Sequence, residues 1–207
     1  MNICTHENES LCEDCQIKGD LMCRFRQSDL WNFLLNFTPF GIVVIAGMVR
    51  AGFGWYLFGL LGYMLFFFFV WEARALCSHC PYWAEEGRIL HCHANSGVFK
   101  IWKFNPKPMS RSEQFQFVIG ALVMIAYPLP FMLIGGQYLF AFITLAAAVA
   151  FTYNLIHTTC TRCINFSCPL NGVPKPTVDS YLRRNPIMRA AWEESGYQLG
   201  KEKRTAA

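Results

Sequence analysis

The chain has 207 residues, of which 54% are hydrophobic and 15% are charged, and its mean hydropathy is +0.25. This composition is typical of an integral membrane protein and argues against a soluble helical domain, whose helices need a solvated polar face. The net charge of +4 is spread over segments beside apolar runs, so it gives no reason to expect nucleic acid as a partner. The composition predicts the lipid bilayer as the first partner.

The charge map locates the membrane spans. Asp, Glu, Lys and Arg are absent from three stretches, 30–49, 51–71 and 114–161. A spanning helix needs about 20 largely apolar residues, so the third stretch holds two spans, divided at Gly135-Gly136-Gln137. We therefore predict an all-α integral membrane protein with four transmembrane helices, near 31–49, 51–71, 115–134 and 138–156. The connections are so short that each consecutive pair forms an antiparallel hairpin.

The basic residues predict the orientation. Segments 1–30, 72–114 and 157–207 hold 17 of the 18 Lys and Arg residues, and only Arg50 lies on the other side. The positive-inside rule then places both termini in the cytoplasm, with the spans in the inner (cytoplasmic) membrane of the cell. Segment 1–30 is polar and lacks the apolar core of a signal peptide, so we expect it to stay in the cytoplasm.

The two halves of the chain are similar in layout. A shift of 83 residues places the Cys77–Cys80 pair on the Cys160–Cys163 pair. Two further similarities accompany it, Gly52 with Gly135 and Cys92-x-x-Asn95 with Cys168-x-x-Asn171. This pattern predicts two duplicated hairpins, related by a pseudo-twofold axis along the membrane normal.

The duplication divides the chain into four parts. Residues 1–30 are a cytoplasmic four-cysteine segment, and 177–207 are an amphipathic C-terminal tail. Between them, the first repeat, 31–109, has a hairpin at 31–71 and a Cys-rich loop at 72–109, and the second repeat, 110–176, has a hairpin at 115–156 and a Cys-rich segment at 157–176. In the tail, Asn185-Pro186 predicts the start of a short helix with Asn185 as its N-cap. The tail suits either the membrane surface or docking on a metal-binding domain or a partner.

All ten cysteines lie in the segments predicted to be cytoplasmic, where thiols stay reduced. Closely spaced cysteines there indicate metal ligands more than disulfides. The N-terminal group is a complete four-thiolate set, Cys4, Cys12, Cys15 and Cys23. Each repeat adds a triad, Cys77, Cys80 and Cys92 in the first and Cys160, Cys163 and Cys168 in the second. His79, His93 and His157 are weaker candidate ligands, which leaves open one Cys3His site per repeat or one shared site.

Either iron–sulfur clusters or Zn²⁺ fit these thiolate sets, and the sequence does not decide between them. Cys80-Pro81 and Cys168-Pro169 resemble the Cys-Pro ending of ferredoxin cluster motifs. A cysteine motif ending in Pro just after a span resembles, over these few residues, the membrane-anchored polyferredoxins of anaerobic respiration. No complete ferredoxin motif follows, and we do not assign the chain to that family. The paired CxxC motifs and the histidines suit zinc equally.

Three functions are compatible with these features. The first is a membrane-anchored iron–sulfur subunit that transfers electrons at the cytoplasmic face, with a redox partner or a larger membrane complex. The second is a zinc-stapled membrane scaffold, assembly factor or regulatory subunit without catalytic activity. The third is a membrane thiol–disulfide oxidoreductase. The sequence contains no phosphate-binding loop, HExxH motif or serine-nucleophile elbow, so it names no enzyme class.

Overall fold

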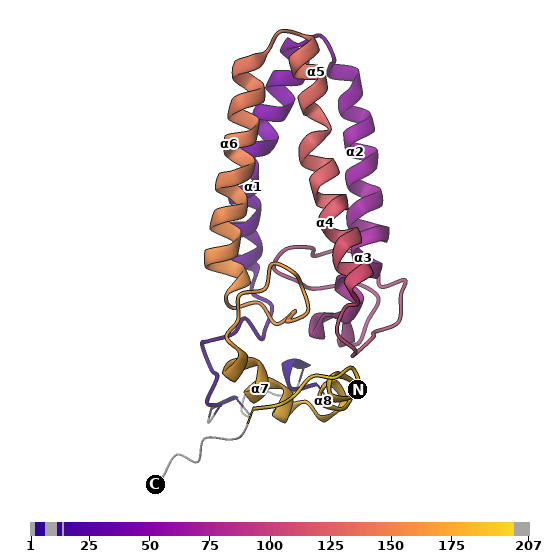
Figure 1. Cartoon of the computed structure of the whole chain (residues 1–207), viewed down its shortest axis with the longest axis vertical. Coiled ribbons are helices and arrows are strands. Elements are labelled where there is room, and N and C mark those ends of the chain that lie inside the picture. The colour runs from indigo at the N-terminus through magenta and orange to yellow at the C-terminus, as the bar shows by residue number, and fades with distance from the viewer. Residues whose placement is uncertain (1–2, 7–11, 14, 201–207) are drawn as a thin grey trace.

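The computed structural model describes residues 3–6, 12–13 and 15–200, and over these residues the chain is helical, without strands. Four long helical runs stand side by side as an elongated bundle, and the Cys-rich loops gather with the two short C-terminal helices at one end (Figure 1). The runs are Gln27–Arg50, Gly54–His79, Arg111–Ile134 and Tyr138–Cys160, each long and apolar enough to cross a membrane. The four predicted helices are thus confirmed, and each extends beyond its predicted bounds at one end or at both.

The runs are built from shorter elements. The first is α1 (Gln27–Arg50), and the second joins η3 (Gly54–Tyr56), α2 (Leu57–Phe66), the π turn η4 (Phe67–Trp71), α3 (Glu72–Ala75) and η5 (Cys77–His79). The third is α4 (Arg111–Ala126) and α5 (Pro128–Ile134), and the fourth is α6 (Tyr138–Leu155) with the π turn η7 (Ile156–Cys160). The third run breaks at Pro128, which lacks an N–H and cannot continue the helical ladder. The remaining short elements are η1 (Cys4–His6), η6 (Pro81–Ala84), α7 (Lys175–Arg184) and α8 (Pro186–Glu194).

The two hairpins turn in the same way. After α1, the N–H of Gly52 bonds to the carbonyl of Val49 and that of Phe53 to Met48. After α5, Gly136 and Gln137 make the corresponding bonds to Leu133 and Met132. Both turns are Schellman motifs, and Gly52 (φ +82°) and Gly136 (φ +69°) occupy the left-handed position that favours glycine. Gly52 therefore corresponds to Gly136 and not, as the 83-residue shift suggested, to Gly135.

The helices pair across the predicted repeats. α1 lies along α6, and the second run lies along α4, as Figure 1 shows. Near the tip, one apolar cluster joins the pairs, with Phe40, Val44, Met48, Leu60, Met132, Ala141 and Ala148 buried. The first helix of each hairpin thus packs against the second helix of the other, which is the arrangement that a pseudo-twofold axis produces. The duplication itself stays a prediction.

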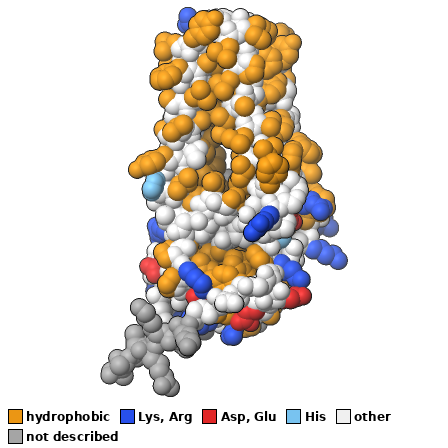
Figure 2. Space-filling model, viewed as in Figure 1, with side chains coloured by type: hydrophobic (Ala, Val, Ile, Leu, Met, Phe, Trp, Pro, Cys, Tyr) orange, Lys and Arg blue, Asp and Glu red, His pale blue; other side chains and the backbone are white. Residues whose placement is uncertain are grey.

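The outer surface of the bundle is apolar. Only 11–22% of the most apolar window of each run is buried within the chain. Large side chains such as Leu35, Phe58, Phe142 and Val149 are therefore exposed. On the face shown in Figure 2, charged side chains gather mainly at the loop end of the molecule. At the opposite tip, Arg50 is the last residue of α1. A surface of this kind needs lipid around it.

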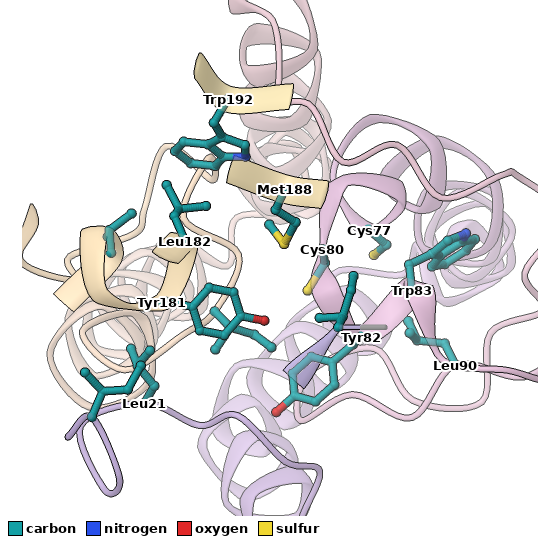
Figure 3. Close-up of a cluster of buried hydrophobic side chains, with 14 of the residues drawn as sticks. Leu21, Cys77, Cys80, Tyr82, Trp83, Leu90, Tyr181, Leu182, Met188 and Trp192 are labelled. Atoms are coloured by element: carbon teal, nitrogen blue, oxygen red, sulfur yellow. The ribbon is translucent and has the colours of Figure 1, made fainter. Parts of the chain in front are cut away.

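A second, separate core lies beneath the bundle. It buries Ile3, Leu21, Cys77, Cys80, Tyr82, Trp83, Leu90, Ile164, Tyr181, Leu182, Met188 and Trp192. In Figure 3, side chains of α7 and α8 face those of the loop after α3, with Cys80 between them. The sequence left two locations open for the C-terminal tail, the membrane surface and a protein surface. In the structure, α7 and α8 pack against the Cys-rich segments. The four-part division of the chain stays a prediction.

Candidate metal centre

In the N-terminal cysteine group, Cys4, Cys12 and Cys15 lie near Cys23. Burial raises the pKa of the Cys23 thiol to about 12, and negative charges on Cys4, Cys15 and Cys12 add to the shift. Cys23 is therefore near enough to interact electrostatically with each of the other three cysteines of this predicted ligand set. Residues 7–11 and 14, which connect parts of this set, lie outside the described residues.

Two side chains hold this group through its sulfur atoms. Arg24 donates from Nη2 to the Sγ atom of Cys12 at 3.6 Å. The Asn185 amide donates from Nδ2 to Cys4 Sγ at 3.2 Å, and its Oδ1 accepts the Cys4 main-chain N–H at 2.8 Å. Asn185 is 1% exposed and also donates to the Tyr181 carbonyl at 2.8 Å. It stands at the N-cap position of α8, as predicted, but its side chain makes no cap bond.

The two cysteine triads meet at the loop end of the bundle. Cys77 and Cys160 lie in the last turns of the second and fourth helical runs, where both are buried. Burial raises the pKa of Cys80 well above its ordinary value, and charges on Cys92 and Cys163 raise it further. Cys163 is affected in the same way, by burial and then by charges that include those of Cys168 and Cys92. Thiols from both triads thus share one neighbourhood.

Main-chain amides point at these thiols. The N–H of Asn165 donates to Cys163 Sγ at 3.5 Å. Equivalent main-chain bonds come to the other sulfurs from residues two or three positions later, from Tyr82 to Cys80, from Ala94 and Asn95 to Cys92, and from Leu170 and Asn171 to Cys168. Each bond lowers a thiol pKa against the effect of burial. Amide donors aimed at sulfur stabilise thiolates and tune the potential of a bound cluster.

Tyr82 lies between the N-terminal group and the triads. Its side chain is buried, and its hydroxyl donates to the carbonyl of Met22. Burial raises its pKa, and so do negative charges on cysteines of all three groups, Cys92, Cys80, Cys163 and Cys23. One phenol ring therefore neighbours all three cysteine groups.

The candidate histidines differ in their surroundings. His79 has both ring nitrogens engaged, Nδ1 with the Lys107 carbonyl at 2.7 Å and Nε2 with Glu113 at 3.3 Å. His157 is exposed and packs against Tyr153 with the rings tilted and their centroids 4.3 Å apart. His93 is 4% exposed, and its Nδ1 has no hydrogen-bond partner. Burial lowers the pKa of His93 to about 4, so its ring is neutral at pH 7, the form that binds metals. The geometry favours His93 over the other two.

The described residues do not form a closed single-ion site. Across 3–6, 12–13 and 15–200, no three His, Cys, Asp or Glu side chains are placed to hold one metal ion. None of the ten cysteines is in a disulfide. The cysteines are thus gathered as neighbours without a finished coordination shell, and their role as metal ligands stays a prediction.

Sequence reasoning missed the side chains that surround the sulfurs. Asn185 was identified only as a helix cap, and Tyr82 was not singled out. Asn95, which donates to Cys77 Sγ at 3.7 Å, and Asn165, which donates to the Leu76 carbonyl at 3.1 Å, were also missed as supports. The recurrence of Cys-x-x-Asn was the one signal that pointed to Asn95.

Comparisons with known proteins do not assign a function to this arrangement. No family model, no curated protein and no solved structure matches the chain. The function must therefore be argued from the cysteine groups and their surroundings.

Proposed function

We propose that the protein is a membrane-anchored iron–sulfur electron-transfer subunit that works at the cytoplasmic face of the membrane. One observation carries the proposal. Three cysteine groups, far apart in sequence, lie in one layer at the end of an apolar four-helix bundle, and Tyr82 neighbours all three. In this function the cysteines are cluster ligands and the helices anchor them beside a membrane carrier.

The surroundings of the sulfurs suit redox centres. Cluster potentials depend on burial and on hydrogen bonds to sulfur, and both are present at Cys80, Cys92, Cys163 and Cys168. The rate of electron tunnelling falls steeply with the distance between two redox centres, so centres that lie close together exchange electrons faster than distant ones. The N-terminal group would receive electrons from a soluble or peripheral partner, and the triads, at the ends of the spans, would deliver them to a carrier in the membrane.

The orientation is part of the proposal. The 17 Lys and Arg residues of segments 1–30, 72–114 and 157–207 support a cytoplasmic location for the cysteines, since only Arg50 lies in a connection on the other side of the spans. An Arg50→Cys variant in intact cells tests this. A membrane-impermeant maleimide should label its new thiol, while the native cysteines should react only after the cells are opened. Labelling of the native cysteines in intact cells would reverse the orientation.

A zinc-stapled scaffold is the second candidate, and the packing of the loop-end core supports it. Ile3, Leu21, Ile164, Tyr181 and Trp192 come from segments with little core of their own, so metal staples would hold them together. A thiol–disulfide oxidoreductase is supported less, because Cys77 and Cys80 are buried away from a protein substrate.

Redox spectroscopy on anaerobically purified protein separates these functions. The electron-transfer proposal predicts broad visible absorption that bleaches with dithionite, an EPR signal of reduced clusters, and reoxidation by a soluble quinone. A colourless protein with stoichiometric zinc would replace it with the scaffold. Metal-free protein in which quinone oxidises cysteine pairs would favour the oxidoreductase.

A further inference from the structure

Glu72 is a buried carboxylate at the junction of the two triads. It is the first residue of α3, at the loop end of the second helical run, and it is 7% exposed. Its Oε2 atom is buried and accepts no hydrogen bond. In the part of the chain that the structure describes, only two other buried side-chain atoms lack a partner, and one of them is Nδ1 of His93, the residue next to Cys92.

The cysteines around Glu72 come from both triads. Its carboxylate interacts electrostatically with Cys77 and Cys92 of the first triad. It also interacts with Cys168 of the second. A carboxylate without a partner is costly in a low-dielectric site, and neighbouring thiolates increase the cost. A metal cation among these groups removes both penalties at once.

Residues 157–176, all of them described, carry the second triad with no Asp or Glu and with one histidine, His157. His157, the histidine nearest to the triad in sequence, is exposed and packs against Tyr153. The shift that relates the two repeats places Glu72 opposite Leu155, so the second repeat has no acid at the position that corresponds to Glu72. Six cysteines with Glu72 and His93 would make two four-ligand sets.

We propose that Glu72 is a non-cysteine ligand of the metal centre between the two triads. This inference rests on the proposed metal-binding function and adds an oxygen ligand to it. A carboxylate suits iron and zinc, and it differs from thiolate in the spectrum and in the stability that it confers on the centre.

The test uses the full-length protein, purified anaerobically, as wild type, Glu72→Gln, Glu72→Cys and Glu86→Gln. Glu86 is an exposed acid in the loop after α3 and serves as the matched control. Metal per chain, the EPR or absorption spectrum and the rate of metal loss to a chelator are measured. We expect Glu72→Gln to lose metal at least tenfold faster with an altered spectrum, Glu72→Cys to retain metal with a shifted spectrum, and Glu86→Gln to match wild type.

The outcomes separate this inference from the proposed function. Wild-type protein that binds no metal would overturn both. Wild-type protein that binds metal, with Glu72→Gln identical to it in metal content, loss rate and spectrum, would overturn the role of Glu72 alone. If Glu72→Gln does not assemble, Glu72→Cys decides, because a replacement ligand must restore the metal content. Failure of Glu72→Cys to do so refutes the inference.

Discussion

Replacing Asn185 with alanine should release the N-terminal cysteine group from α7 and α8. The change removes the bonds from Asn185 to the Cys4 main chain and to the Tyr181 carbonyl, both 2.8 Å long, and the weaker contact with Cys4 Sγ. Each bond contributes about 0.5–1.5 kcal/mol, and a buried group left without a partner costs about 1–3 kcal/mol. The local opening free energy of the segment around Cys4 should therefore fall by about 2–4 kcal/mol.

The assay is the rate at which Cys4 is alkylated by iodoacetamide under anaerobic conditions, followed by peptide mass spectrometry. Because about 1.4 kcal/mol corresponds to a factor of ten, the rate should rise roughly 30- to 700-fold. Asn105→Ala is the control, since Asn105 is exposed and its side-chain Oδ1 accepts a local bond from the Lys107 N–H. A rise of Cys4 reactivity no larger than in the control would refute the assigned role of Asn185.

Three further predictions concern the two cores and the tail. Gly135→Ala should lower the thermal unfolding temperature in detergent, because its new Cβ would lie 2.5–2.7 Å from Ala51, including main-chain atoms. Gly62→Ala, in open space, should not lower it, and equal temperatures for the two variants would contradict this packing. Removing metal with a chelator should expose α7 to trypsin while the far-UV dichroism of the bundle persists, because the bundle and the loop end have separate cores. If the trypsin resistance of α7 and the helical dichroism were lost together, the two cores would not be separate. Burial pushes the pKa of Asp179 up, but hydrogen bonds, led by that from Lys175, leave it below the ordinary value. The stability that Asp179 contributes should be complete above about pH 4, the ordinary range of Asp, and should be lost as the pH falls further. Hydrogen exchange of the Gly200 amide, which donates to Asp179, measures this loss. An Asp179→Asn variant with the same pH profile as the wild type would contradict the prediction.

The bundle could be predicted because lipid imposes a simple rule on sequence. Charged residues are excluded from a span, so their absence located all four helices. The predicted ends of the helices were less accurate, since a helix continues through polar residues where loops cover those residues. The second run therefore reaches His79, eight residues beyond the predicted end at Trp71, and includes Glu72.

The surroundings of the cysteines could not be predicted, because they depend on contacts between distant segments. Asn185 reaches Cys4 across 181 positions, and no local pattern distinguishes it from an ordinary helix cap. Glu72 follows an apolar run directly and resembles an interfacial charge. It is nevertheless buried, with cysteines of both triads near it. The docking of α7 and α8 was equally open, since an amphipathic helix suits either a membrane surface or a protein core.

The central claim is that the cysteine groups bind metal, and the most direct test is the metal and sulfide content of the full-length protein purified without oxygen. The account predicts iron and acid-labile sulfide in stoichiometric amounts, lost in part when Cys80 and Cys163 are replaced by serine. Protein that is folded, monodisperse and free of both iron and zinc would contradict it.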